Sequence, residues 1–402
     1  IIDMIRKIYL DRIRPYYHSE QLKAIVGARR SGKSTIMKQI VDEISITISK
    51  DRILYLDFED YEMSIYQDDP KRFYQIIKNY VSGKDRCYVF IDEIHHMKDY
   101  EKVLASIRST LGCSVFVTSS SSSLLRGTLA STLTGRYISF HVLPFQYSEV
   151  LEYKNVEDSP DEFISYMEKG GFPLVYKEYF MDPKQYAIEL YDAIIKNDIV
   201  KANEIRNSDQ LKRFASYIFV HSGEIISSES ITKHIKSTNE DISTQSCYKY
   251  LKCLEEAFLV DKCKRYDIKG KALLDAKSKY YAVDPSFINI NEGSADINKS
   301  FILETIVYNE LKSRNYEIYV GKTHKGEVDF VIFDGKKKCY IQVCYLLASE
   351  EIIRREFDAF LSIKDACPRF VFSLDTLNFS RDGITHINIR DFLTHKKELL
   401  LL

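Results

Sequence analysis

The chain has 402 residues, of which 57 are Lys or Arg and 58 are Asp or Glu, so its formal net charge is -1. This balance excludes a globally basic nucleic-acid coat protein, and any nucleic-acid surface must be a local patch. With 45% hydrophobic residues, 29 Tyr and 22 Phe, the composition is typical of a folded globular protein and not of a disordered chain. A chain of this length predicts two or three domains.

The sequence predicts neither a membrane span nor an export signal. No apolar run approaches the ~20 residues that a membrane helix needs. The first ten residues alternate charged and apolar side chains, which is not the pattern of a signal peptide. The eight cysteines are scattered without a C-x-x-C pair, which favours reduced thiols over zinc ligands or disulfides. Together these features predict a cytoplasmic protein.

Apolar runs and helical patterns alternate over the first 150 residues, which predicts a parallel α/β sheet. The expected strands are 22–26, 53–56, 88–91, 115–118 and 137–142. From 149 to about 260, apolar residues at helical spacing predict the helices 162–169, 183–196 and 211–220. Further on, a second α/β unit is predicted, with strands 280–283, 317–320, 327–333, 339–343 and 370–373 and helices 301–313 and 350–364.

A phosphate-binding loop follows the first predicted strand and opens a helix. It matches G-x-x-x-x-G-K-[ST] in full, with Gly27, Ala28, Arg29, Arg30, Ser31, Gly32, Lys33 and Ser34, and Thr35 continues it. The two glycines let successive backbone N–H groups point at phosphate oxygens, and the helix N-terminus adds its positive end. Lys33 is expected to reach the β- and γ-phosphates of ATP, and the Ser34 hydroxyl is expected to ligate Mg²⁺.

Two carboxylates end the strand predicted at 88–91. Asp92 is expected to hold the Mg²⁺ shell, and Glu93 is placed to act as the general base on the attacking water. A surface carboxylate is the alternative interpretation of Glu93 alone. His95 and His96 follow, and we interpret them as structural or solvent-facing and not as metal ligands.

Polar residues follow the next two strands. Thr118, Ser119 and Ser120 lie where a polar side chain can contact the γ-phosphate or the water. Arg136 precedes the fifth strand and is a candidate to reach a nucleotide in its own subunit or the next. A surface salt bridge is the alternative for Arg136.

These motifs together resemble a prokaryotic AAA-related P-loop ATPase family whose C-terminal part is a domain of unknown function. The matching segments are GARRSGKST at 27–35, LDFED at 56–60, FIDEI at 90–94, SLL at 123–125, TGRY at 134–137, LPF at 143–145 and GGFP at 170–173. One departure is that Thr-Gly-Ser, usual in the family after the fourth strand, is here Thr118-Ser119-Ser120.

The resemblance implies an α/β P-loop sheet with added-strand order, then helices, a winged helix and a restriction-endonuclease-like domain. The corresponding ranges are an AAA-like ATPase domain at 1–148, a helical segment at 149–220, a winged helix at 221–285 and a degenerate PD-(D/E)xK nuclease-like domain at 286–402.

A basic stretch at 261–279 accompanies the expected winged helix. Seven basic residues stand there against three Asp, and a basic hairpin beside a helix-turn-helix suits a phosphate backbone. The helix-turn-helix itself is expected from helices at 228–235 and 243–258. DNA is therefore a candidate partner through this stretch, and packing against another protein segment is the equal alternative.

The last domain carries the skeleton of a metal-dependent nuclease with two replacements. Glu304 and Asp329 are present, but Gln342 and Cys344 stand where Glu and Lys are needed. Because an amide ligates Mg²⁺ poorly and a thiol does not replace an ammonium group, we interpret the nuclease site as inactive.

The sequence thus predicts an Mg²⁺-dependent ATPase that couples its nucleotide state to an assembly bound to DNA or protein. One alternative is a low-turnover binding switch or oligomerisation module, favoured slightly by the serine tract. Another is an ATP-regulated nuclease, against which Gln342 and Cys344 count. A homo-oligomer and a protein partner are further candidates, and no membrane partner is expected.

Overall fold

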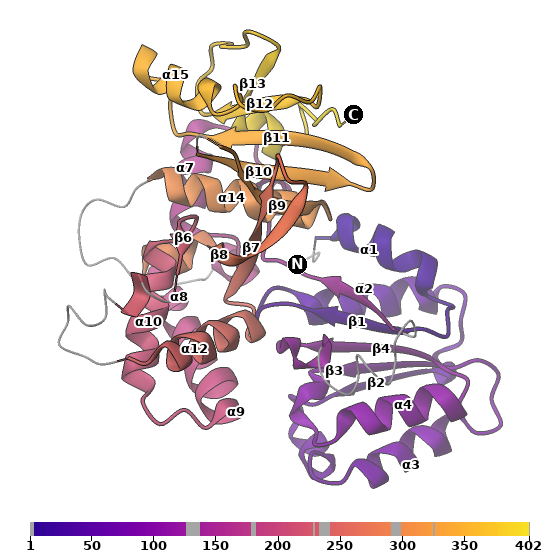
Figure 1. Cartoon of the computed structure of the whole chain (residues 1–402). Helices are drawn as coiled ribbons and strands as arrows, with labels where there is room; N and C mark the ends of the chain where they lie inside the picture. Colours follow the sequence, from indigo (N-terminus) through magenta and orange to yellow (C-terminus); the bar gives the residue numbers. More distant parts are fainter. Residues whose placement is uncertain are drawn as a thin grey trace. The chain divides into compact units, whose positions relative to one another are not determined.

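The structure, a computed structural model, describes residues 4–125, 137–177, 182–227, 230–232, 242–290, 299–324 and 326–401. Two compact units make up the chain: Ile1–Leu143 with Glu256–Phe258, and Pro144–Glu255 with Leu259–Leu402 (Figure 1). Two sequence predictions fall outside the described residues, namely Arg136 and most of the helix expected at 228–235.

The first unit is built on a five-stranded parallel sheet with the order β2-β3-β4-β1-β5. Its strands are β1 (Leu22–Val26), β2 (Ile53–Asp57), β3 (Tyr88–Asp92), β4 (Ser114–Ser119) and β5 (Tyr137–His141). Each lies within one residue of its predicted bounds. The inner strands β1, β3 and β4 are buried throughout, as the largely apolar runs of a parallel sheet are. With β4 between β3 and β1, the sheet has the added-strand order that the resemblance implied.

Among its described residues, this unit has the helices α1 (Lys7–Ile13), α2 (Lys33–Ser45), α3 (Pro70–Val81) and α4 (Tyr100–Thr110). Apolar residues of α1 and α2, among them Leu10, Ile13 and Ile40, share one buried cluster with Ile25 of β1 and Phe116 of β4. The loop between β1 and α2 is therefore anchored at both ends in the core.

A lysine is buried in β1, an inner strand of this sheet. Lys23 is fully buried, and its Nζ donates to the carbonyl oxygen of Ser19 at 2.9 Å and to Ser114 Oγ at 2.7 Å. Burial lowers the pKa of Lys23 to about 7. Between pH 10.5 and 7 the unfolded chain therefore binds a proton that the folded chain does not. As the pH falls through this range, Lys23 lowers the free energy of unfolding by an increasing amount.

Replacing Lys23 with Met is expected to stabilise the protein at pH 7 by on the order of 2 kcal/mol, after the two lost hydrogen bonds are allowed for. The gain should shrink as the pH rises toward 10.5, and urea unfolding of both proteins at pH 7 and pH 9 measures it. Lys78→Met, which removes an exposed lysine from α3, is the control and should change little at either pH. An equal gain at both pH values would contradict the argument.

The second unit begins with helices. They are α6 (Tyr147–Lys154), α7 (Pro160–Lys169), α8 (Pro183–Ala193), α9 (Lys201–Asn203), α10 (Ser208–Val220), α12 (Thr244–Glu256) and α13 (Pro285–Asn289). A π-helical segment, Ile194–Val200, continues α8. The helices predicted at 162–169, 183–196 and 211–220 correspond to α7, α8 with part of the π-helical segment, and α10.

An eight-stranded sheet with the order β13-β12-β11-β10-β9-β7-β8-β6 completes the second unit. Its strands are β6 (Ile225–Ile226), β7 (Val260–Asp267), β8 (Ala272–Ala282), β9 (Glu317–Lys322), β10 (Glu327–Asp334), β11 (Lys337–Val343), β12 (Arg369–Ser373) and β13 (Ile384–Asn388). Because β7 pairs in parallel with β9, the segments 221–285 and 286–402 contribute to one sheet.

The helices that accompany this sheet are α14 (Lys299–Ser313), α15 (Glu350–Asp358) and α16 (Ile389–Leu393). The helix predicted at 350–364 ends early, at Asp358, because the apolar residues Phe360 and Ile363 reach the core through tight turns instead of a further helical turn. Strand β8 begins eight residues before the strand predicted at 280–283, since it runs the length of a hairpin with β7.

Two further predictions can be compared with the described part of the chain. No helix there is long and apolar enough to cross a membrane. All eight cysteines are free thiols, and all but Cys367 are buried, as expected for reduced structural cysteines.

Candidate functional site

The loop between β1 and α2 has a backbone that its glycines make possible. Gly27 has a φ of 153°, and a Cβ on it would lie 2.1 Å from the carbonyl oxygen of Val142. Gly32, with a φ of 98°, is the N-cap of α2. A side chain at Gly27 would clash, so the loop lies directly against the segment that leaves β5. The left-handed φ of Gly32, which favours glycine, turns the chain sharply into α2.

The first turn of α2 offers backbone donors. Among the described residues, no side chain caps this helix, so the amides of Lys33, Ser34 and Thr35 remain available to an anion at the positive end of α2. Ser34 and Thr35 are half-buried in the same turn. This donor set fits a phosphate group.

Lys33 is buried at the mouth of this loop. Its side chain is only 2% exposed, and its Nζ donates to the carbonyl oxygen of Ala28 at 3.1 Å and lies 3.3 Å from Glu93 Oε1. The lysine of the loop and the second carboxylate after β3 therefore face each other, although 60 residues separate them in the sequence.

Glu93 is held in place by three groups. Besides Lys33, the backbone N–H of Ser120 donates to its Oε2 at 3.0 Å, and His95 Nδ1 lies 3.2 Å from the same oxygen. Burial alone would raise the pKa of Glu93, but the Lys33 ammonium and His95 outweigh it and hold that pKa below its usual range. Glu93 is thus a buried, ionised carboxylate with a φ of 50°.

Asp92, beside it, is oriented by the two flanking strands. Tyr55 of β2 donates its hydroxyl to Asp92 Oδ2 at 2.8 Å, and the Thr118 hydroxyl of β4 donates to Oδ1. Thr118 Oγ1 also accepts the backbone N–H of Glu93 at 2.8 Å. The polar tip of β4 therefore positions both carboxylates.

Two residues that support the site were not predicted from the sequence. One is Tyr55, whose parallel register opposite Phe90 allows it to reach Asp92. The other is Arg6, which is almost fully buried and donates from Nη1 to the carbonyl oxygens of Ser31 at 2.9 Å and Leu143 at 3.0 Å. A charged residue in an apolar N-terminal segment is a weak signal, because most such residues are solvated.

Of the remaining loop residues, Arg29 is half-buried, Arg30 is exposed and Ser31 is fully buried. Arg29 forms an ion pair with Glu59 at 3.3 Å, and Arg30 takes a left-handed conformation with a φ of 66°. The backbone N–H of Ser31 donates to the carbonyl oxygen of Ala28, which keeps the loop tightly turned.

The oxygens of Ser34 and Asp92 suit a hard cation such as Mg²⁺. In the described ranges, no group of three or more His, Cys, Asp or Glu side chains could hold a metal ion by itself. A cation here would therefore take its remaining ligands from water and phosphate, as Mg²⁺ ordinarily does.

The basic stretch 261–279 forms the β7–β8 hairpin. Lys264, Lys269, Lys271 and Lys277 are exposed. The seventh basic residue, Lys279, is buried among acidic side chains, so the number of basic residues available at this surface is smaller than the sequence suggested.

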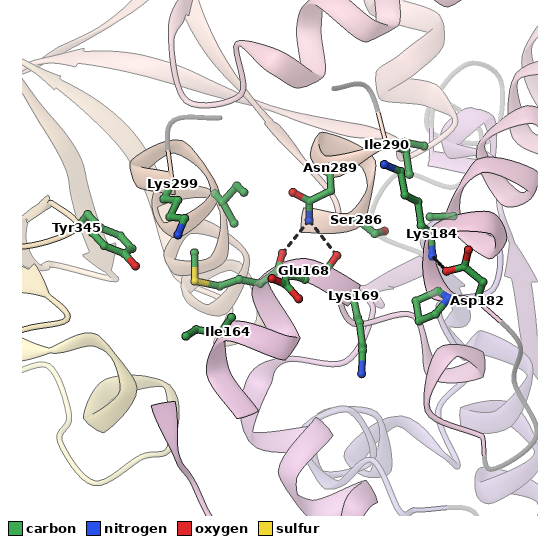
Figure 2. Close-up of a pocket in the computed structure, with 14 residues that line it drawn as sticks. Ile164, Glu168, Lys169, Asp182, Lys184, Ser286, Asn289, Ile290, Lys299 and Tyr345 are labelled. Atoms are coloured by element: carbon green, nitrogen blue, oxygen red, sulfur yellow. Dashed lines mark hydrogen bonds between the residues drawn. The ribbon is translucent and has the colours of Figure 1, made fainter. Parts of the chain in front are cut away.

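A cavity of about 490 Å³ lies in the second unit (Figure 2). Its lining includes Lys169, Lys184 and Lys299, and Asn289 Nδ2 donates to the carbonyl oxygens of Met167 and Glu168, both at 2.9 Å. None of its lining residues belongs to the predicted site.

Comparison with known proteins gives matches along most of the chain. A family model described as an AAA domain matches residues 19–151, and one described as a domain of unknown function matches residues 160–295. An uncharacterized protein of Haemophilus influenzae is 31% identical over 395 residues, which cover 96% of this chain and 98% of that protein. One of Methanocaldococcus jannaschii is 30% identical over 394 residues, covering 92% and 85%.

A solved structure, the Walker-type ATPase of Pyrococcus abyssi, matches with a TM-score of 0.46 and 13% identity, over 72% of this chain and 96% of that chain.

Proposed function

Because this chain belongs to the family of AAA-domain proteins that includes the Haemophilus influenzae and Methanocaldococcus jannaschii relatives, we propose that it binds ATP at the loop 27–35 and hydrolyses it. The observation that carries the proposal is the meeting of Lys33 and Glu93 at the uncapped N-terminus of α2. A buried cation, a buried carboxylate and free helical amides in one place are what binding and hydrolysis of a phosphoanhydride require.

Each side chain has a distinct part in this proposal. The amides of the loop and Lys33 bind the β- and γ-phosphates, and Ser34 with Asp92 holds Mg²⁺. Bound Mg²⁺ neutralises charge on the phosphate oxygens. Glu93 accepts a proton from the attacking water. Tyr55 and Thr118 fix the Asp92 carboxylate, and their neutral hydroxyls leave its charge intact.

Arg136 completes the proposal as an arginine finger, acting on a nucleotide in its own subunit or in the next one of a homo-oligomer. The segments 149–220, 221–285 and 286–402 would then transmit the nucleotide state to DNA or a protein partner, with 221–285 as a winged helix. Exposed lysines on the β7–β8 hairpin support the DNA version.

A second candidate is a binding switch with little turnover. In the described structure both Lys33 and the Ser120 amide contact the Glu93 carboxylate, so groups of the protein itself engage the general base. A γ-phosphate that attracts Lys33 would have to compete with Glu93, and a site that keeps this pair closed would bind ATP and release it unchanged.

Steady-state phosphate release by the full chain with Mg-ATP, with and without duplex DNA, tests these proposals. We expect Mg²⁺-dependent release that DNA stimulates several-fold. Tight ATP binding without release would favour the switch. Absence of both binding and release would refute the nucleotide site.

Two matched double variants test whether the β7–β8 hairpin binds DNA. Lys269→Glu/Lys271→Glu reverses two exposed lysines at the β7–β8 turn, and Lys336→Glu/Lys337→Glu reverses two at the β10–β11 turn. Each phosphate contact adds about -0.9 to the slope of log affinity against log salt concentration. We expect only the first pair to flatten that slope, with basal phosphate release unchanged in both.

A further inference from the structure

Three carboxylates of the second unit converge on one ammonium group. Lys279 Nζ of β8 lies 2.9 Å from Glu304 Oε1 of α14, 2.8 Å from Glu327 Oε1 and 3.4 Å from Asp329 Oδ1, both of β10. We call Lys279, Glu304, Glu327 and Asp329 the Lys279 cluster. It joins the β7–β8 hairpin to a helix and a strand that lie 25 to 50 residues further along the chain.

Three of the four residues in the cluster are removed from water, and Glu327 is half-buried. Lys279 is 3% exposed, and Glu304 and Asp329 are each 7% exposed. Neutral donors support the carboxylates: the Tyr281 hydroxyl donates to Glu304 Oε1 at 2.7 Å, and the backbone N–H of Val343 donates to Asp329 Oδ2 at 2.8 Å. Such a cluster is built with defined partners and is not a chance meeting of surface charges.

The charges in the cluster depend on one another. Burial would lower the pKa of Lys279, but Glu304, Asp329 and Glu327 outweigh it and raise that pKa well above its usual value. For Asp329, burial and the negative charge of Glu304 raise the pKa, while Lys279 opposes them. Without the ammonium group, Glu304 and Asp329 would face each other in a poorly solvated place.

The cluster also contains the two nuclease-like carboxylates, Glu304 and Asp329. The residues around them do not fit a divalent cation. The Gln342 amide oxygen, in place of a carboxylate, accepts the backbone N–H of Asp329 at 3.2 Å, and burial raises the pKa of the Cys344 thiol, which keeps it neutral. The position between the carboxylates is taken by Lys279 Nζ.

We propose that the ammonium group of Lys279 takes the place of a divalent cation between Glu304, Glu327 and Asp329, so that the second unit binds no metal there and is held together by this buried ion cluster. The nuclease motif has a lysine at the position of Cys344, after β11, whereas Lys279 lies in β8. Lys279 therefore supplies positive charge in place of the cation and does not substitute for the lysine of the motif. Through it, the basic hairpin is fixed to α14 and β10. The inference is independent of nucleotide binding.

Thermal unfolding of the full chain with Mn²⁺ or with EDTA tests the inference. All proteins carry Ser34→Ala/Asp92→Asn, which removes the cation site of the nucleotide loop, and with the Lys279 cluster intact we expect the same midpoint in both. For Lys279→Met we expect a midpoint lower by about 5–10 °C in EDTA, because the carboxylates lose their counter-charge. Mn²⁺ should restore part of that loss by occupying the vacated position.

Two variants serve as controls. Lys277→Met removes an exposed lysine of the same strand and should leave the midpoint unchanged. Lys279→Met/Glu304→Gln should be less destabilised than Lys279→Met and should lose the response to Mn²⁺, because one of the two buried carboxylates is gone.

Electron paramagnetic resonance of Mn²⁺ titrated into a chain that keeps Lys279 makes the inference testable even if Lys279→Met fails to fold. The nucleotide loop is removed from this measurement by using Ser34→Ala/Asp92→Asn in the absence of ATP. Free Mn²⁺ only is the expected spectrum. A bound signal that Glu304→Gln abolishes would overturn the inference, as would a Lys279→Met midpoint equal to that of the chain that keeps Lys279.

Discussion

Glu93→Gln is expected to slow ATP turnover by ~10²-fold or more, the usual scale for loss of a general base. The substitution keeps the size of the side chain and its contact with the Ser120 amide but removes the charge that attracts Lys33. Because Glu93 competes with the nucleotide for Lys33, ATP affinity should stay the same or rise. Phosphate release and calorimetric titration with ATP measure the two effects separately.

The matched control is Glu62→Gln, which neutralises an exposed carboxylate of the same unit and should change neither quantity. If Glu93→Gln binds ATP and turns it over at the wild-type rate, another residue positions the water. If the variant loses ATP affinity, the ion pair between Glu93 and Lys33 stabilises the loop in its binding conformation and does not compete with the nucleotide.

The strands and the phosphate-binding loop of the first unit could be predicted from the sequence alone. Its strands could be placed almost to the residue, because each is a short apolar run and the loop 27–35 has a motif with one structural solution. The meeting of Lys33 with Glu93 follows from that topology, since β1 and β3 flank β4 and all three end at the same edge of the sheet.

What the sequence could not supply are contacts that depend on packing between distant segments. Tyr55 and Arg6 support the site through geometry that no local pattern encodes. Lys23 is a clear example, since its neighbours predict a buried strand while its own charge predicts exposure. Because β1 is paired on both sides, with β4 and β5, the lysine is buried and its pKa is lowered to about 7.

The second unit was harder to predict for the same physical reason. The basic composition of the β7–β8 hairpin predicts a surface for DNA. The structure shows that its Lys279 is buried and pairs with residues up to 50 positions away. The register of β7 beside β9 is likewise set by contacts across the sheet and not by either strand alone.

Lys33→Ala is expected to weaken ATP binding by about 10²-fold, the scale of a charged hydrogen bond to phosphate. Lys33 is the one loop residue whose ammonium group is buried at the mouth of the loop, where it is 2% exposed and already desolvated. The amides of α2 would remain, so weak binding should persist. Calorimetry with Mg-ATP measures the loss, and Lys38→Ala, an exposed lysine of the same helix, is the control.

The same substitution affects Glu93, which allows a second and independent check. With Lys33 gone, burial is opposed only by His95 and the Ser120 amide, so the pKa of Glu93 should rise. ATP binding by Lys33→Ala should then improve as the pH is lowered, because protonating Glu93 removes a negative charge that repels the phosphates, whereas Lys33→Ala/Glu93→Gln should lack this pH dependence. Wild-type affinity in Lys33→Ala, within twofold, would place the nucleotide elsewhere in the protein.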